Sequence, residues 1–382
     1  MKIGIVTFWW SKDNYGQILQ CYALQKYLRN LGHDAYLIRY LGNNLEDSLN
    51  SYKRIPPLYI KCLKILNPIK VACFIKRKLE HLFNPNFSKE LPRFFDEFQK
   101  RNLHFSDRVY HSYAELKAAP PQADCYIVGS DQVWNMHWFG EKLEDYQKAL
   151  HAYFLDFGNP QIKRMSYAAS WSCDSLPENV YQEIQPLLAK FNYVSVLEFS
   201  GIQMCEKCGC KNAEHVLDPT MLLDAESYRS LYRQVENSKV VEKKFLLLYL
   251  LGTSCDLDIN KVYRFAKTHH LEVVYVSGNG KSDKYSKTFA TIEQWLWLVD
   301  NAEYVITNSY HCSVFSLLFK KHFAVAPIIG KFASMNSRIE NLFNQWNCGN
   351  RFIKQNNFAI LDIDYNANLK VPQNSFLKAI SN

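Results

Sequence analysis

The chain alternates short apolar segments with segments of helical periodicity, and the alternation runs through both halves. Apolar runs rich in β-branched and aromatic residues predict buried strands, and apolar residues three or four positions apart predict helices. In the first half the expected strands cover residues 3–8, 35–40, 125–128, 166–169 and 193–197. In the second half they cover residues 245–251, 272–276, 304–307 and 323–326. Strands that alternate with helices form parallel sheets covered on both faces, so an α/β fold is predicted.

The length of the chain indicates that this alternation of strands and helices forms two domains. At a typical size of about 100 to 200 residues per domain, 382 residues are too many for one compact core. A charged stretch at residues 236–244 separates the two series of strands. We therefore predict two Rossmann-like, doubly wound domains, residues 1–235 and 236–382, that face each other across a cleft.

Apolar run lengths and cysteine usage indicate a cytoplasmic protein. The longest apolar run, residues 245–251, is far shorter than the roughly 20 residues that a membrane-spanning helix needs. Residues 1–10 are apolar but lack a small-residue cleavage site, so we interpret them as a first strand. Eleven scattered cysteines, an odd number, favour a reducing compartment over a disulfide framework.

A basic insertion at about residues 50–90 carries much of the positive charge. The net charge is +8, and residues 53–78 contain eight Lys or Arg and no acidic residue. Basic and apolar residues alternate there at roughly helical spacing, a pattern typical of segments that bind anionic lipid surfaces. A solvated helix with its apolar face on the domain is the plainer interpretation. Nucleic-acid binding is not expected, because no reader motif accompanies the charge.

Polar side chains gather at three expected strand-to-helix turns, residues 11–16, 129–134 and 308–313. In open α/β sheets, ligands bind beyond the carboxyl ends of the strands, where helix N-termini present unpaired N–H groups. Helix capping accounts for the Ser, Asn and Asp residues at these turns. It does not account for Tyr15, Trp134 or His311, so we expect a binding site at these turns.

The same turns carry a family resemblance. Six segments follow one another in the order and spacing of the polysaccharide pyruvyl transferase family: NYGQILQ at 14–20, GSDQVWN at 129–135, SYAAS at 166–170, LDPT at 217–220, ITNSYH at 306–311 and NSR at 336–338. The resemblance runs from about residue 3 to about residue 352, with the basic stretch as a variable insertion. Each motif is modest alone, and six in order are specific.

The resemblance implies a GT-B-like fold with phosphoenolpyruvate as donor and no further cofactor. It implies transfer of pyruvate to two hydroxyls of a hexose, in a lipid-linked oligosaccharide or a surface polysaccharide precursor, to form a cyclic ketal with release of phosphate. Membrane contact through residues 53–78 would then hold the enzyme at the inner face of the cell membrane. Such chemistry requires an acid, a base and cations.

On the donor side the resemblance points to His311 as general acid or base, since imidazole titrates near neutral pH. Arg338 and Lys331 would grip carboxylate and phosphate, with Arg351 as a weaker third candidate. The neighbouring donor-side residues are Asn308, Ser309 and Tyr310. A structural histidine and solvated surface cations are the alternative interpretations.

Two positions depart from the family pattern. Many members have an arginine where this chain has Ser309, and often another where it has Leu197. These departures leave open which cation holds the donor, and they increase the importance of Arg338.

On the acceptor side, Asp131 is the expected hydrogen-bond partner or base. Trp134 or Tyr15 would offer a stacking face for a pyranose ring, although a packed core aromatic is the alternative for Trp134. The remaining acceptor-side candidates are Gly16, Gln20, Ser130 and Gln132.

Other chemistries have weaker support. Cys205, Cys208, Cys210 and His215 lie close in sequence, but their spacing matches no common zinc motif, so no metal is expected. Residues 280–282 resemble the end of a phosphate-binding loop, but Tyr275 stands where a glycine is required. Two alternative functions stay open: a GT-B glycosyltransferase using a nucleotide sugar, and a non-catalytic glycan-binding scaffold.

Overall fold

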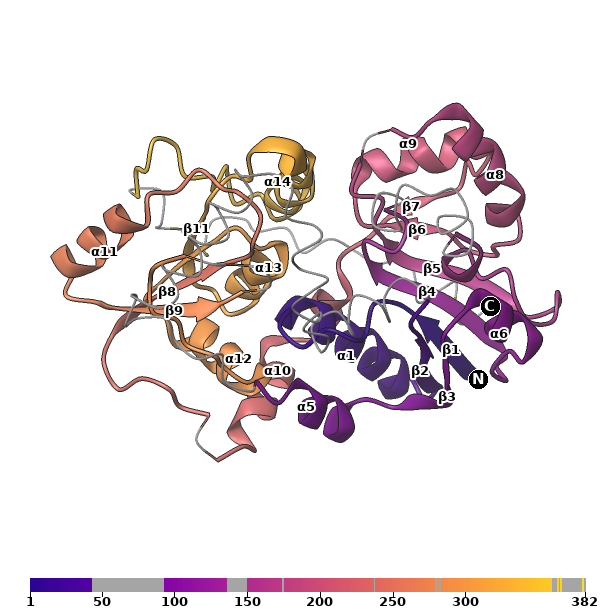
Figure 1. The fold of residues 1–382 in the computed structure, drawn as a ribbon, viewed down its shortest axis with the longest axis horizontal. Helices are drawn as coiled ribbons and strands as arrows, with labels where there is room; N and C mark the ends of the chain where they lie inside the picture. Colours follow the sequence, from indigo (N-terminus) through magenta and orange to yellow (C-terminus); the bar gives the residue numbers. More distant parts are fainter. Residues whose placement is uncertain are drawn as a thin grey trace, which may run out of the picture.

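The computed structural model describes residues 1–42, 93–135, 150–173, 175–236, 238–278, 281, 283–358, 363, 365 and 380. Figure 1 shows two lobes side by side, with the first helix of the chain between them. The basic stretch 53–78 lies outside the described residues, as do Gly280 and Ser282. Within the described residues, no helix is both long and apolar enough to cross a membrane.

The amino-terminal lobe is built on a seven-stranded parallel sheet, in the order β3-β2-β1-β4-β5-β6-β7. Its strands are β1 (Lys2–Val6), β2 (Asp34–Tyr40), β3 (Phe105–Tyr110), β4 (Cys125–Asp131), β5 (Lys163–Ala169), β6 (Ser195–Val196) and β7 (Glu214–His215). The direction of winding reverses between β1 and β4, because β1 pairs with β2 on one side and with β4 on the other. Loops at such a switch point diverge and leave room for a ligand.

The carboxy-terminal lobe repeats this plan on four parallel strands, in the order β11-β10-β8-β9. They are β8 (Phe245–Leu250), β9 (Glu272–Ser277), β10 (Tyr304–Thr307) and β11 (His322–Val325). The switch point lies between β8 and β10. The predicted α/β class, with two Rossmann-like domains built on parallel sheets, is confirmed.

One expected strand, residues 193–197, is wrong in length. Only Ser195 and Val196 form β6, with a single isolated bridge between Tyr193 and Met165. Side chains replace part of the ladder here: Ser166 Oγ donates to the carbonyl of Ser195 at 2.9 Å and accepts from its N–H at 2.8 Å. The serines thus interrupt the regular pairing that the apolar pattern predicted.

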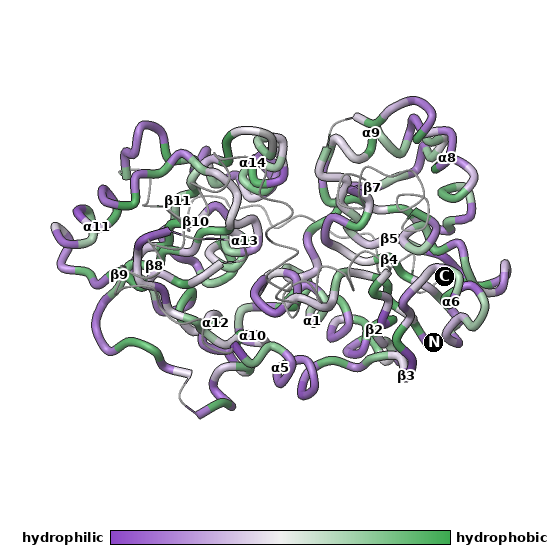
Figure 2. Tube along the Cα trace, in the orientation of Figure 1, coloured by the Kyte–Doolittle hydropathy of each residue, from purple (hydrophilic) through white to green (hydrophobic). Residues whose placement is uncertain are grey.

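Helices cover the sheets and join the lobes. Those of the first lobe and its connections are α1 (Tyr15–Asn30), α5 (Phe95–Asn102), α6 (Tyr113–Ala118), α8 (Glu178–Leu188), α9 (Phe199–Lys207), η2 (Pro219–Leu222) and α10 (Ala225–Arg233). Those of the second are α11 (Ile259–Thr268), α12 (Ile292–Asn301), α13 (Tyr310–Leu318), η3 (Gly330–Met335) and α14 (Asn336–Trp346). Figure 2 shows hydrophobic residues inside each lobe and hydrophilic ones on outer helices such as α11.

A single cluster of buried side chains extends from the first lobe into the second. Tyr15, in the first turn of α1, stacks on Trp295 of α12 with ring centroids 5.2 Å apart, and its hydroxyl donates to the carbonyl of Ala290 at 2.7 Å. Arg229 of α10 forms an ion pair with Asp300 of α12 at 2.8 Å. The lobes are therefore packed together at the amino-terminal end of α1, where the burial of apolar side chains stabilises their relative placement.

Candidate active site

The two switch points bring charged side chains from both lobes together. His311 lies in the first turn of α13, directly after β10, and its side chain is only 12% exposed. Its Nε2 lies 3.5 Å from Oδ2 of Asp218, which caps η2 in the first lobe. Nε2 is buried and makes no hydrogen bond with the described residues. The imidazole thus faces a carboxylate of the opposite lobe.

The imidazole of His311 also lies directly on Gly16, at the start of α1. A Cβ atom placed on Gly16 would stand 2.3 Å from both Cγ and Nδ1 of the ring, and 2.6 Å from its Cβ. Real Cβ atoms essentially never approach so closely, so only glycine allows this contact. Gly16 was expected to bind the acceptor; in the structure it provides the surface on which His311 lies.

Asp131 ends β4 with a φ of 81°, the left-handed region that L-residues with a side chain adopt at a cost of about 1–3 kcal/mol. Its Oδ1 accepts from the N–H of Gln132 at 2.8 Å. Burial raises the pKa of Asp131, and the nearby charges of His311 and Arg338 oppose that rise. Backbone strain of this kind gathers at functional sites.

Asp218 has the opposite electrostatic outcome. Burial alone would raise its pKa, but the charge of His311 and the hydrogen bonds from Thr220 outweigh burial, so the pKa of Asp218 is lowered. Two neighbouring carboxyl groups are thereby driven apart in pKa. Such a separation is typical of sites that need one ionised and one protonatable carboxyl group.

Arg338, in the first turn of α14, brings a cation to the same place. It is 6% exposed, its guanidinium carbon lies 5.5 Å from the ring centre of Tyr310, and its Nε has no hydrogen-bond partner among the described residues. Glu198, at the start of α9, is buried too: burial raises its pKa, while Arg338 and donors at Ser170 and Trp171 oppose the rise.

The other donor-side candidates serve the fold. Asn308 is buried; its Oδ1 accepts from the N–H of Leu251 at 2.7 Å, joining the ends of β10 and β8. Ser309 caps α13 by accepting from the N–H of Cys312. Arg351 is buried and donates to the carbonyl of Phe323 at 2.8 Å, and its role as a donor ligand stays a prediction. Lys331 lies in η3, and its side chain is outside the described residues.

The two predicted stacking faces are wrong. Trp134 is fully buried, stacks on Phe154 at 4.9 Å and donates to the carbonyl of Tyr153. Tyr15 is fully buried between the lobes. Both rings enter the core because the turns that carry them fold inward over the sheets, which sequence periodicity does not reveal.

Three further acceptor-side candidates are also buried. Gln20 is fully buried and donates to Thr7 Oγ1 at 3.1 Å, so it is not available to an acceptor. Gln132 accepts from Asn135 at 2.9 Å. Ser130 donates its hydroxyl to Asp218 at 3.2 Å, and so connects the Asp131 turn to the carboxylate that faces His311.

A sequence model of the polysaccharide pyruvyl transferase family matches residues 14–326, most of the chain. The protein belongs to the polysaccharide pyruvyl transferase family. No curated protein gives a significant match.

Solved structures similar to this pyruvyl transferase family member are distant. One is the UDP-GlcNAc 2-epimerase of Methanocaldococcus jannaschii in complex with UDP-GlcNAc and UDP, at 12% identity and TM-score 0.46 over 94% of this chain and 91% of that one. The UDP-GlcNAc 2-epimerase of Neisseria meningitidis has 10% identity and TM-score 0.40, over 90% and 91% of the two chains. The glycosyltransferase SsfS6 of Streptomyces sp. SF2575 has 11% identity and TM-score 0.38, over 94% and 89%.

Sequence reasoning about this family member missed Asp218 and Glu198, which interact with His311 and Arg338, and Phe199, which follows Glu198 in the chain. Asp218 belongs to the LDPT segment, so its motif was a usable signal. Glu198 and Phe199 follow the short strand β6 without any motif. Phe199 is 59% exposed at the start of α9, and its ring centre lies 6.1 Å from that of His215, whose Nε2 meets Gln345 of α14 at 3.0 Å. An exposed aromatic ring therefore stands where the two lobes meet.

The cysteine cluster of this family member offers no ligand set. Burial raises the pKa of Cys205, Cys208 and Cys210, which disfavours the thiolate form that binds metal. His215 has its Nε2 between the carbonyl of Leu197 and the amide of Gln345. In the part of the chain that is described, no group of three or more His, Cys, Asp or Glu side chains could hold a metal ion.

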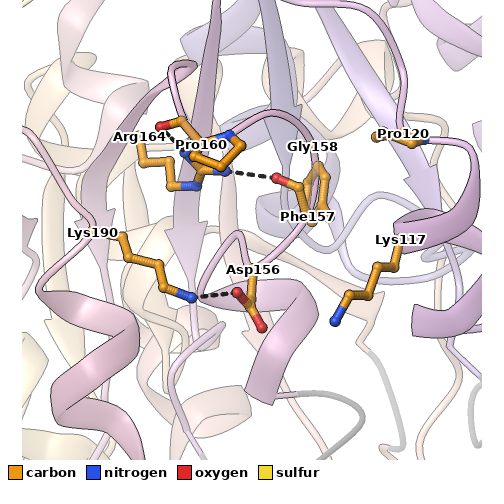
Figure 3. Close-up of a pocket in the computed structure, with 8 residues that line it drawn as sticks. All are labelled: Lys117, Pro120, Asp156, Phe157, Gly158, Pro160, Arg164 and Lys190. Atoms are coloured by element: carbon orange, nitrogen blue, oxygen red, sulfur yellow. Dashed lines mark hydrogen bonds and ion pairs between the residues drawn. The ribbon is translucent and has the colours of Figure 1, made fainter.

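A separate cavity of about 490 Å³ lies at the opposite edge of the first sheet, near the amino ends of β4 and β5 (Figure 3). Its charged groups are largely used within the protein. Lys190 is paired with Asp156, which also accepts from His151 at 2.7 Å, and Arg164 donates to backbone carbonyls such as those of Leu155 and Phe157. Because none of the residues that line this cavity belongs to the His311, Asp131 and Arg338 group, it is separate from the candidate site.

Proposed function

We propose that the protein transfers pyruvate from phosphoenolpyruvate to two hydroxyls of a hexose in a surface glycan precursor, forming a cyclic ketal and releasing phosphate. Family membership supports a transferase that acts on polysaccharide. The observation that carries the proposal is the convergence of His311, Arg338 and Asp131 from the two lobes. The three supply an acid, a buried cation and a carboxylate at one place.

The roles follow from the chemistry of each group. His311 would give a proton to the methylene carbon of the donor, so that C2 becomes electrophilic. One sugar hydroxyl then bonds to C2 and loses its proton, the C2–O bond to phosphate breaks, and the second hydroxyl bonds to C2 and loses its proton. One of the two hydroxyl protons replaces that of His311, and the other leaves with phosphate.

Arg338 would hold the anionic donor. A guanidinium buried to this degree, with Nε unpartnered among the described residues, can donate to carboxylate or phosphate in a fixed geometry. Because the family arginines are absent at Leu197 and Ser309, we assign this role to Arg338, and Lys331 stays a predicted second cation. Asp131 would take a proton from an attacking hydroxyl.

On the acceptor side, Phe199 takes the place of the buried Trp134 and Tyr15. It is an exposed aromatic side chain directly after Glu198, whose carboxyl group interacts with Arg338. Exposed aromatic faces beside polar groups are common in ligand sites. We assign Phe199 as the surface against which the acceptor hexose packs.

The direct test is to incubate the protein with phosphoenolpyruvate and a panel of synthetic and lipid-linked glycosides, and to follow phosphate release and product mass. A gain of the pyruvyl mass with equimolar phosphate supports the proposal. Stabilisation by uridine or guanosine nucleotides but not by phosphoenolpyruvate would instead favour a nucleotide-sugar glycosyltransferase. Glycoside binding without phosphate release would favour a scaffold.

A lipid-linked acceptor and a position at the inner face of the cell membrane belong to the same proposal. The basic segment 53–78 supports it by charge alone. Co-sedimentation with vesicles of neutral phospholipid, with and without about a third anionic lipid, tests it: binding only to the anionic vesicles, lost at high salt, is expected.

A further inference from the structure

We infer that Asp218 is the positioning residue of His311: a carboxylate of the first lobe that receives the imidazole of the second lobe at Nε2. The inference rests on the proposed function only for the reaction that His311 performs. The geometry of the pair is independent of the substrate.

Asp218 is held in place by its own lobe. Its Oδ1 accepts from the N–H of Thr220 at 2.9 Å and from the hydroxyl of Thr220 at 2.6 Å, and its Oδ2 accepts from Ser130 at 3.2 Å. It is 1% exposed. None of these donors comes from the second lobe, so residues of the first lobe alone hold the orientation of the carboxylate. Such fixed partners are what keep a catalytic group in one geometry.

The ring of His311 has a defined orientation against this carboxylate. Gly16 contacts the Cγ and Nδ1 side of the ring, and Oδ2 of Asp218 stands 3.5 Å from Nε2. Nε2 is buried without another partner among the described residues, so Asp218 is the acceptor that it faces. Hydrogen bonds at catalytic groups are often long in the empty site and shorten when substrate binds.

The charged neighbours of this pair are few in the described part of the chain. Asp131, at the end of β4, interacts electrostatically with both members of the pair and with Arg338 of α14. The ring of Tyr310 meets the ring of His311 edge-on, with ring centres 5.4 Å apart. Of the two carboxyl groups, Asp218 is the one whose pKa is lowered, so it is the ionised partner at neutral pH. An anion at Nε2 favours the Nε2–H tautomer.

The pairing has a consequence for the two lobes. His311 and Asp218 are brought together only while α13 lies against α1 and η2. The acid and its orienting carboxylate are therefore assembled by lobe contact, as in enzymes whose closure completes the catalytic set.

The experiment compares Asp218→Asn with Asp224→Asn. Asp224 is a matched control, because it also caps a helix by accepting from the N–H and hydroxyl of one residue, Ser227, without touching His311. Asp218→Asn should lower kcat about 10²-fold or more, with the KM for phosphoenolpyruvate within about threefold, and Asp224→Asn should change neither. In a His311→Ala background, Asp218→Asn should cost nothing further. Equal effects of the two Asn variants would overturn the inference.

A second readout needs no activity. Nitrogen-15 NMR of the histidine side chains should show the Nε2–H tautomer for neutral His311 in the parent protein. In Asp218→Asn, that tautomer preference should weaken, because the anion that faces Nε2 is gone. An unchanged tautomer would refute the inference even if turnover falls. A normal NMR result without pyruvyl transfer would instead defeat the proposed function and leave the pairing intact.

Discussion

The contact between His311 and Gly16 predicts the outcome of a single added methyl group. In Gly16→Ala, the new Cβ would lie 2.3 Å from Cγ and Nδ1 of the ring, so the ring must move by about 1 Å to reach an ordinary contact. Overpacking of this kind costs about 1–3 kcal/mol, while alanine in a helix gains up to about 1 kcal/mol over glycine. The net loss of stability is therefore about 0–3 kcal/mol.

Catalysis should suffer far more than stability. A displacement of about 1 Å at a reacting group can cost about 10²-fold in rate. We expect Gly16→Ala to lower kcat about 100-fold while the midpoint of thermal unfolding falls by only a few degrees. The assay is phosphate release from phosphoenolpyruvate at saturating acceptor, together with calorimetry.

The control for Gly16→Ala is Gly201→Ala in the first turn of α9. Its Cβ would meet Trp171 at 3.0 Å and Val196 at 3.1 Å, a tight contact that does not involve the histidine. Gly201→Ala should therefore lower stability with little change in kcat. Parent-like kcat in Gly16→Ala would show that the ring does not need its position on Gly16, and the reasoning would fail.

Three further changes have defined outcomes. Asp131→Asn keeps a residue that tolerates positive φ but removes the base, so kcat should fall about 10²- to 10⁴-fold. The parent's kcat should rise as the pH passes the raised pKa of Asp131, and this rise should disappear in the variant. An unchanged pH profile would exclude the carboxylate as base. Glu198→Gln should raise stability at pH 7.5, because the pKa of Glu198 is raised and the parent protein loses stability as the pH rises through that pKa. The gain should vanish below about pH 4, where the carboxyl group is protonated in both the folded and the unfolded protein. A gain that persists there would contradict the assignment. Phe199→Ala should raise the KM for the glycoside about tenfold and leave the KM for phosphoenolpyruvate unchanged, whereas Phe199→Tyr should keep the parent KM for the glycoside. Equal shifts in both KM values would remove Phe199 from the acceptor side.

Much of the architecture was accessible to sequence reasoning, for a local reason. Runs such as Phe245–Leu250 are apolar at every position, which suits only strands buried on both faces of a parallel sheet. Glycine at position 32, with φ of 84°, follows the end of α1, where glycine is the residue that most often stops a helix. Winding rules then place the turns after β1, β4 and β10 at switch points, so the positions of His311 and Asp131 beyond the strand ends could be predicted.

The identity of the residues that face the substrate was less accessible. Trp134 and Tyr15 share the motifs of the site, yet their rings fill the core. Phe199 carries no motif and is exposed. Motif membership reports that a turn has a special shape, and the direction of each side chain depends on packing with residues far away in the sequence.

What the sequence determined alone is the alternation of strands and helices, the two lobes and the positions of the polar turns, since these depend on periodicity and turn chemistry within short segments. Only the tertiary structure decided that His311 lies on Gly16, 295 positions earlier in the chain, and opposite Asp218. It likewise decided that Arg338 is buried beside Glu198, and that one carboxyl group is driven toward its protonated form and another toward its ionised form. These properties arise from burial and from charges on the opposite lobe, which exist only once the lobes have packed together.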